Sequence, residues 1–333
     1  MGGGRECISS LLDPAYWEAV CPWLQCRMDS SMLPKKPQEQ GEKGGKAEGA
    51  HRQGPPESEQ ERDKAAELLN RGFFQIKAAA LPQVRVGLVK ALGRGVLRLQ
   101  ELGHSASAIS SYDEAWELQH SLGPLVSRIT GNPLSGDCYS FYVSPVMPSG
   151  FVGAHRDKPT ADGSNSFRPD GMPMYATVWV ALTPATPQSS CLQFVAKGDD
   201  AGYTLGGDAL DVVLPTPRSW QNIVCTPCEP GDLLCFSHRV AHWASKAIAP
   251  AAPRVALSFS VAHPDFETPN FLSTDFPPLA LRVGLTAARA ILYSEQVPMH
   301  KCVCVLMYMH TVHTVCVYLF PPLSLTHTHS HSH

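Results

Sequence analysis

The chain has 333 residues, a formal net charge of −3 and 44% hydrophobic residues, enough for one large folded domain with extensions. This charge gives no reason to expect nucleic acid or a membrane as a partner. Eleven cysteines, with no apolar leader segment after Met1, indicate reduced thiols and predict a cytoplasmic location.

The chain divides into four regions by composition. Residues 1–32 contain a few clustered aromatic and leucine side chains, and we expect them to dock on the core. Residues 33–63 are rich in Gly, Glu, Gln, Lys and Pro and have almost no large hydrophobic residue. Such a segment buries too little apolar surface to offset its ordering entropy, so it is interpreted as a disordered linker or insertion. Residues 64–275 form the predicted main domain.

Within the main domain, helices are expected first and strands later. The pattern predicts a short helix over Ala65–Asn70, a strand over Gly72–Lys77 and a helix carrying the apolar residues from Val84 to Leu97. Another helix is predicted over Asp113–Ile129. From Cys138 onward, short apolar strands separated by Pro/Gly turns predict a mainly β fold with flanking helices, namely a barrel or jelly roll.

The C-terminal region, residues 276–333, has an unusual pattern. Cys and Val alternate over 302–305, and His alternates with Thr or Ser over 326–333, as in translated dinucleotide-repeat DNA. We interpret this extension as disordered or as an artefact of the gene model. A membrane anchor over 303–320 and a His-rich metal tract are the alternatives, and we expect no membrane association.

The strongest functional signal is a set of three metal-ligand residue types. His155-Arg156-Asp157 is followed 85 residues after Asp157 by His242. Alternate residues of a strand share a face, so His155 and Asp157 can point at one metal while Arg156 points away. Two histidines and one carboxylate form the facial triad of non-haem Fe(II) enzymes. The sequence therefore predicts an iron site.

Arg254, 12 residues after His242, begins a strand with two different faces. Its guanidinium could bind the distal carboxylate of a dicarboxylate cosubstrate as a bidentate fork. On the same face lie only small residues, among them Ser258, while the opposite face is apolar and predicts a core contact. The first face would suit an interior that holds a small anion. An ordinary strand with a surface arginine is the alternative.

The chain resembles the phytanoyl-CoA dioxygenase family of Fe(II)- and 2-oxoglutarate-dependent oxygenases from about Lys64 to Phe271. The motifs that carry the resemblance are Gly72-Phe-Phe-Gln-Ile, His155-x-Asp157, Tyr175-Ala-Thr-Val-Trp-Val-Ala-Leu182, Gly231-Asp-Leu-Leu-Cys-Phe-Ser-His238, His242-Trp-Ala-Ser245 and Pro253-Arg254-Val-Ala-Leu-Ser-Phe259. The resemblance implies a double-stranded β-helix (jelly-roll, cupin-like) core. It also implies a dioxygenase that hydroxylates a small-molecule or lipid-like substrate with O₂ and releases succinate and CO₂.

The resemblance also implies roles for individual residues. His155, Asp157 and His242 would be the catalytic Fe(II) ligands, and Arg254 would bind 2-oxoglutarate. Trp179, Ser245 and Ser258 are further candidates for the cosubstrate pocket, although Ser245 is offset by one position from the family serine, and Trp179 could equally be a core aromatic residue. Ascorbate is a candidate reductant.

Several alternatives stay open at the level of sequence. His238 could replace His242 as the distal ligand, and Cys225-x-x-Cys228 could belong to a zinc site, although no second pair accompanies it. The family often has Glu-Asn-Gly and Pro-Gly-Ser-His where this chain has Gln188-Ser-Ser190 and Ala196-Lys-Gly-Asp199. A cupin-like metal enzyme without 2-oxoglutarate and a non-catalytic ligand-binding jelly roll are therefore the competing hypotheses. Substrate identity and oligomeric state are not predicted.

Overall fold

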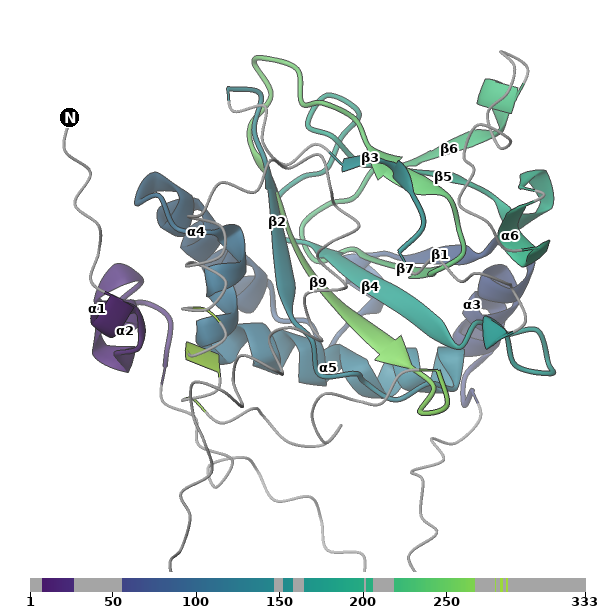
Figure 1. Cartoon of the computed structure of the whole chain (residues 1–333), viewed down its shortest axis with the longest axis horizontal. Coiled ribbons are helices and arrows are strands. Elements are labelled where there is room, and N and C mark those ends of the chain that lie inside the picture. The colour runs from purple at the N-terminus through teal and green to yellow at the C-terminus, as the bar shows by residue number, and fades with distance from the viewer. Residues whose placement is uncertain are drawn as a thin grey trace, which may run out of the picture.

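The computed structural model describes residues 8–26, 56–146, 152–157, 165–200, 202–205 and 219–266, together with positions 279, 282, 283 and 286. Two antiparallel sheets and a set of helices make up this part of the chain (Figure 1). The helices are α1 (Ile8–Leu11), α2 (Pro14–Val20), α3 (Glu59–Arg71), α4 (Val86–Glu101), α5 (Asp113–Thr130) and α6 (Gly202–Leu205). Short 3₁₀ turns are η2 (Ala78–Ala80), η3 (Ala106–Ser111), η5 (Lys197–Asp199) and η7 (Ser219–Asn222).

The strands of the described ranges are β1 (Phe73–Ile76), β2 (Tyr139–Val143), β3 (Val152–His155), β4 (Tyr175–Ala181), β5 (Leu192–Val195), β6 (Ile223–Thr226), β7 (Leu233–Ser237), β8 (His242–Ala244) and β9 (Arg254–Ala262). One sheet has the order β1-β7-β4-β9-β2 and the other β3-β8-β5-β6, with every pair antiparallel. From β2 onward, successive strands of the described ranges lie in opposite sheets, except that β5 and β6 are neighbours in one sheet. This alternation is that of a double-stranded β-helix, so the predicted mainly β jelly-roll fold with flanking helices is confirmed.

Strand β9 shows why the sheets have two kinds of face. Val255, Leu257, Phe259 and Val261 pack with the helices, whereas Ala256 joins the apolar cluster between the sheets. All nine residues of β9 are buried. The alternative of an ordinary strand with a surface arginine is therefore wrong for β9. Its small side chains instead face the interior, where Arg254 is 1% exposed.

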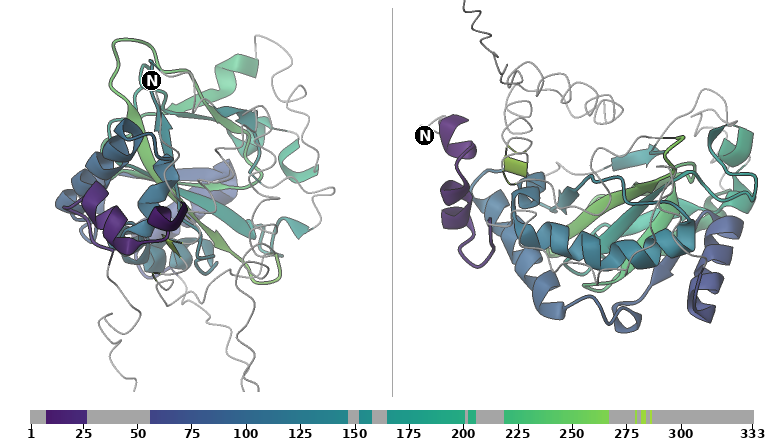
Figure 2. Two further views of the ribbon diagram at one scale, coloured as in Figure 1. Left: turned by 60° about the vertical axis from the view of Figure 1, so that its left-hand side comes forward. Right: turned by 90° about the horizontal axis from the view of Figure 1, so that it is seen from below.

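The helices cover the outer face of the five-stranded sheet, as the view from below shows (Figure 2). Buried leucine and valine side chains of α4 and α5 lie in one cluster with the outward-facing residues of β4, β7 and β9. The N-terminal segment packs on this layer, where Trp17 is fully buried and the Tyr112 hydroxyl donates to its carbonyl at 2.8 Å. None of the helices in the described ranges is both long and apolar enough to cross a bilayer.

Helix α3 begins earlier than the sequence patterns predicted. Residues 59–63, which composition placed in the linker, form its first turns because Ser58 and Glu61 make a reciprocal capping box. The helix ends at Gly72, whose φ of 84° is the left-handed conformation that glycine adopts without strain. The rest of the proposed linker, up to residue 55, lies outside the described residues.

Positions 279, 282, 283 and 286 of the C-terminal extension are described, and some of them contact the predicted main domain. Arg282 and Val283 are buried, and the Arg282 guanidinium donates to the Asp113 carboxylate at 2.7 Å. Thr286 hydrogen bonds to the Ser111 hydroxyl at 2.7 Å. A local repeat pattern further along the tail gave no signal of these long-range contacts. The repeat-like segments themselves, 302–305 and 326–333, lie outside the described residues.

Replacing Glu61 with glutamine is expected to lower the stability of the fold at neutral pH, and less so in acid. The Arg128 guanidinium binds the Glu61 carboxylate at 2.8 Å and, against the effect of burial, holds its pKa below the usual value. A carboxylate with a depressed folded pKa contributes stability above its unfolded pKa of about 4.3, and this stability is lost as pH falls through the folded pKa. Melting curves should show Glu61→Gln less stable at pH 7, with the difference from the parent chain shrinking below about pH 4. A difference that is constant with pH would contradict this.

Candidate metal centre and cosubstrate pocket

The three predicted metal ligands meet where β3 ends and β8 begins. His155 ends β3 and is the register partner of His242, which begins β8, and Asp157 follows two residues after His155. The Nε2 atoms of both histidines lie 3.3 Å from Asp157 Oδ1. One ligand atom from each residue lies within 4.8 Å of the other two, and no other group of this kind occurs in the described ranges. The arrangement fits one divalent metal ion.

Each of these three side chains has a second partner that leaves one ligand atom for a metal. His155 Nδ1 lies 2.8 Å from the Gly153 carbonyl oxygen, and His242 Nδ1 lies 3.1 Å from the Val240 carbonyl oxygen. A carbonyl can only accept, so both Nδ1 atoms carry a proton, which leaves the Nε2 atoms as the ones that a metal ion could bind. Backbone acceptors of this kind are the usual outer partners of metal-binding histidines.

Thr177 of β4 fixes the carboxylate. Its hydroxyl donates to Asp157 Oδ2, which leaves Oδ1 facing the two Nε2 atoms. Thr177 was not among the predicted site residues, although its position two residues before Trp179 puts both side chains on the interior face of one strand. A polar residue on such a face was the available signal.

The electrostatics of the cluster favour an anionic carboxylate. Burial opposes the charge of Asp157, but the two imidazoles outweigh it and hold its pKa well below the usual value. For His155, burial lowers the pKa, and the hydrogen bond and charge of Asp157 more than compensate, so the net shift is upward. A divalent cation at this position would satisfy the carboxylate and displace the histidine protons.

His238, the alternative distal ligand, lies elsewhere. It is fully buried after β7, its Nδ1 is 2.9 Å from the Tyr175 carbonyl oxygen, and its ring packs at 4.9 Å from that of Phe266. The possible zinc residues also differ from a metal site, since Cys225 is exposed and the buried Cys228 thiol donates to the Thr226 carbonyl at 3.5 Å. The described geometry thus favours His242.

Arg254 is a buried cation beside the apolar cluster that also surrounds His242. His242 packs on Phe194 and Phe236, which belong to the same inter-sheet cluster as Trp179, and the Arg254 guanidinium lies 5.6 Å from the Trp179 ring centroid. Arg254 donates to the Ser190 carbonyl at 2.8 Å. Among the described residues no carboxylate pairs with it, and its Nε has no hydrogen-bond partner. Burial lowers its pKa to about 10.

This environment fits the carboxylate of a bound ligand. A buried cation without a counterion costs several kcal/mol, and an anion that enters the pocket would remove most of that cost. The Ser245 hydroxyl, directly after β8, is also buried without a hydrogen-bond partner in the described part of the chain. Ser258 differs, because its hydroxyl donates to the Val178 carbonyl at 3.0 Å. The two serines thus differ, because only the Ser258 hydroxyl proton is engaged in a described hydrogen bond.

Ser190 is held in a strained conformation beside Arg254. Its φ of 76° lies in the left-handed region, in the segment where the resembling family often has Glu-Asn-Gly, and its hydroxyl is buried without a partner among the described residues. Replacing Ser190 with glycine is expected to raise the unfolding free energy by about 1–2 kcal/mol, because glycine adopts this φ without strain. Urea unfolding measures the change, and Ser190→Ala is the control that keeps the strain. A glycine variant no more stable than the alanine variant would contradict the explanation.

Residues 113–256 match the family model described as phytanoyl-CoA dioxygenase (PhyH). No curated protein matches the sequence. Similar solved structures include the epimerase SnoN in complex with Fe³⁺, alpha ketoglutarate and nogalamycin RO (18% identity, 61% of this chain and 84% of that chain, TM-score 0.45). Two others are HygX from Streptomyces hygroscopicus with nickel and 2-oxoglutarate bound (16% identity, 61% of this chain and 87% of that chain, TM-score 0.45) and the non-heme monooxygenase ThoJ–Ni complex (16% identity, 69% of this chain and 98% of that chain, TM-score 0.45).

Proposed function

We propose that the protein is an Fe(II)- and 2-oxoglutarate-dependent dioxygenase acting on a small-molecule or lipid-like substrate, because residues 113–256 match the phytanoyl-CoA dioxygenase family model. One observation carries the proposal above all. His155, Asp157 and His242 offer three ligand atoms within 4.8 Å of one another, each oriented by a further hydrogen bond. This donor set leaves positions for a cosubstrate and for O₂.

Each residue of the site would have a distinct role in this reaction. His155, Asp157 and His242 would hold Fe(II), and Thr177 and the Gly153 and Val240 carbonyls would keep them oriented. Arg254 would neutralise the far carboxylate of 2-oxoglutarate. When bound, the iron and 2-oxoglutarate supply the oxidising chemistry, with succinate and CO₂ as co-products and O₂ as oxidant.

Other residues of the pocket would contribute position and polarity. Trp179 would form an apolar wall against the Arg254 guanidinium, and Ser245 would offer a hydroxyl to the cosubstrate. Ser258 would line the pocket as a small residue. Ascorbate remains a candidate reductant. A cytoplasmic location and the lack of a nucleic-acid or membrane partner remain predictions from the sequence.

The test is an anaerobic titration of the full chain with Fe(II) and then 2-oxoglutarate, followed in visible absorbance. The proposal predicts a charge-transfer band that needs both the iron and 2-oxoglutarate, and release of succinate when O₂ and a substrate are admitted. Iron binding without the band would favour the cupin-like enzyme that does not use 2-oxoglutarate. Failure to bind iron would favour a ligand-binding jelly roll.

A further inference from the structure

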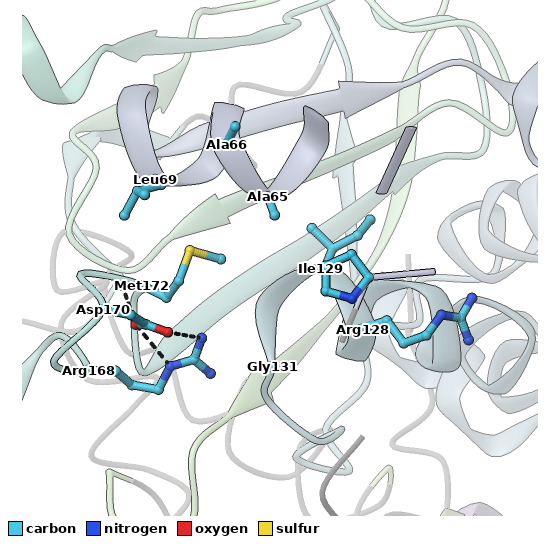
Figure 3. A pocket seen from close by; sticks show the side chains of 10 residues that line it. Ala65, Ala66, Leu69, Arg128, Ile129, Gly131, Arg168, Asp170 and Met172 are labelled. Atoms are coloured by element: carbon cyan, nitrogen blue, oxygen red, sulfur yellow. Dashed lines mark hydrogen bonds and ion pairs between the residues drawn. The ribbon is translucent and has the colours of Figure 1, made fainter. Parts of the chain in front are cut away.

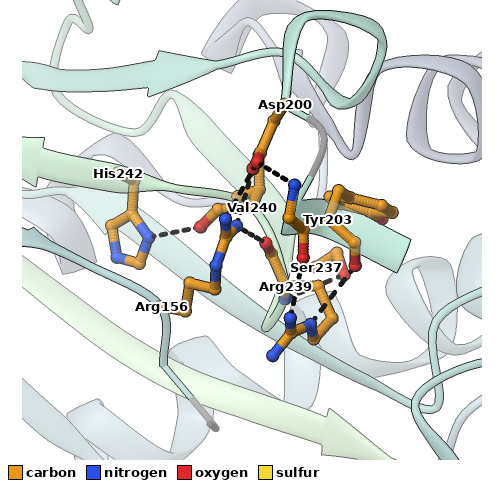
Figure 4. Close-up of polar contacts among 8 residues, drawn as sticks. Arg156, Asp200, Tyr203, Ser237, Arg239, Val240 and His242 are labelled. Carbon is orange, nitrogen blue, oxygen red and sulfur yellow. Dashed lines mark hydrogen bonds and ion pairs between the residues drawn. The ribbon is translucent and has the colours of Figure 1, made fainter. Parts of the chain in front are cut away.

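Arg156, the residue between two of the proposed metal ligands, forms a buried ion pair on the side away from the metal. Its guanidinium donates to both carboxylate oxygens of Asp200, at 2.6 Å to Oδ2 and 2.9 Å to Oδ1. The side chains of the two residues are 1% and 0% exposed. Figure 4 shows this pair at the centre of a polar network that reaches His242 through the main chain.

The same guanidinium reaches the turn that carries the third ligand. Arg156 Nη1 also donates to the main-chain carbonyl of Arg239. The next residue, Val240, supplies the carbonyl that orients His242 through Nδ1 at 3.1 Å. One side chain therefore joins the His155–Asp157 segment to the β7–β8 turn just before His242.

Further contacts secure the far side of this network. Asp200 Oδ1 accepts from the Gly202 amide at 2.9 Å, and the Arg239 guanidinium donates to the Gly202 carbonyl at 2.9 Å. A Cβ at Gly202 would lie 2.7 Å from Arg156 Nη2, so a larger residue there would displace the guanidinium from its place in this network. The segment that contains Asp200 and α6 is thus held against both ligand-bearing segments.

The energetics suggest a role other than stability. Desolvating two charges cancels most of their attraction, and buried ion pairs are often replaceable by apolar residues without loss of stability. A bidentate guanidinium, in contrast, fixes direction as well as distance. The pair is suited to hold the ligand-bearing segments in one geometry.

We propose that Arg156 and Asp200 are positioning residues that hold His155 and Asp157 in register with His242. The proposal rests on the metal site proposed above. Outer partners of metal ligands typically contribute 10- to 100-fold in metal affinity. We expect a loss of this size when the pair is removed, with little change in the stability of the metal-free fold.

The test compares two matched double variants of the full chain. Arg156→Met/Asp200→Asn removes the pair but keeps an acceptor for the Gly202 amide. Arg282→Met/Asp113→Asn makes the same changes in another buried pair, which joins the C-terminal segment to α5. For each protein, Co(II) is titrated anaerobically with its visible spectrum recorded, and the melting temperature is measured in the presence of a chelator.

The first variant is expected to bind Co(II) about 10- to 100-fold more weakly, with an altered spectrum, while the control variant keeps the parent affinity and spectrum. Parent-like affinity and spectrum in the first variant would overturn the proposal. If that variant fails to fold, Arg156→Lys decides, because lysine keeps the charge but cannot fork to Asp200 and Arg239 together. Weakened Co(II) binding in Arg156→Lys supports the proposal, and unchanged binding overturns it. If the parent chain itself binds no metal, the proposed function fails together with this inference.

Discussion

Replacing His242 with alanine is expected to weaken Fe(II) binding by more than about 100-fold and to abolish the 2-oxoglutarate charge-transfer band. His242 Nε2 lies 3.3 Å from Asp157 Oδ1, and the residue is 4% exposed. A mobile side chain from the surface therefore cannot reach its position and replace it as a ligand. Loss of a direct ligand should exceed the 10- to 100-fold effect of losing an outer partner. Anaerobic titration with the band as readout measures both effects.

His238→Ala is the matched control, because His238 is equally buried and was the alternative ligand in the sequence. Its imidazole packs on Phe266 and bonds to the Tyr175 carbonyl, so we expect a loss of stability of about 2–4 kcal/mol without loss of iron affinity in the folded protein. The reverse pattern, with iron lost in His238→Ala and kept in His242→Ala, would show that the distal ligand is assigned wrongly.

Features that depend on the short period of a helix or a strand were predictable from the sequence. The helix over Asp113–Ile129 was expected and α5 ends one residue later, because Gly131 adopts φ 71° and closes it. The His155-x-Asp157 step follows from the two-residue period of a strand. The jelly-roll fold followed from the spacing of the strands and from the family motifs.

Features that depend on distant contacts or on a single cap were not predictable. The start of α3 depends on Ser58 and Glu61, which occur in a stretch whose composition resembles a linker. Arg156 and Asp200 are 44 residues apart and meet only when β3 lies beside the segment before α6. Arg282 reaches Asp113 across 169 residues. In each case the tertiary fold decides which local propensity is realised.

The pocket around Arg254 links ligand binding to the stability of the fold, because its buried charge opposes folding and favours the binding of an anion. The Arg254 guanidinium is 1% exposed with no carboxylate partner among the described residues, and burial lowers its pKa to about 10. The free protein therefore carries an uncompensated charge in the interior. A pocket that is costly to maintain when empty binds its anion more tightly, because the anion removes that cost.

Replacing Arg254 with methionine should accordingly affect stability and binding in opposite directions. Removing the buried charge relieves a desolvation cost of several kcal/mol, while the lost hydrogen bond to the Ser190 carbonyl costs about 1–3 kcal/mol. We expect the metal-free protein to become more stable by about 1–2 kcal/mol in urea unfolding. Loss of a buried charge contact of 2–5 kcal/mol corresponds to a rise of about 30- to 4000-fold in the 2-oxoglutarate concentration needed for half of the charge-transfer band.

Arg254→Lys separates charge from shape, since lysine keeps the cation but cannot bind a carboxylate with two parallel donors. Its 2-oxoglutarate requirement should fall between those of the parent chain and Arg254→Met, without the gain in stability. Fe(II) affinity before 2-oxoglutarate is added should be the same in all three proteins, because Arg254 contacts none of the ligands. An unchanged 2-oxoglutarate requirement in Arg254→Met would remove the main support for this cosubstrate and leave the metal cluster to a cupin-like enzyme.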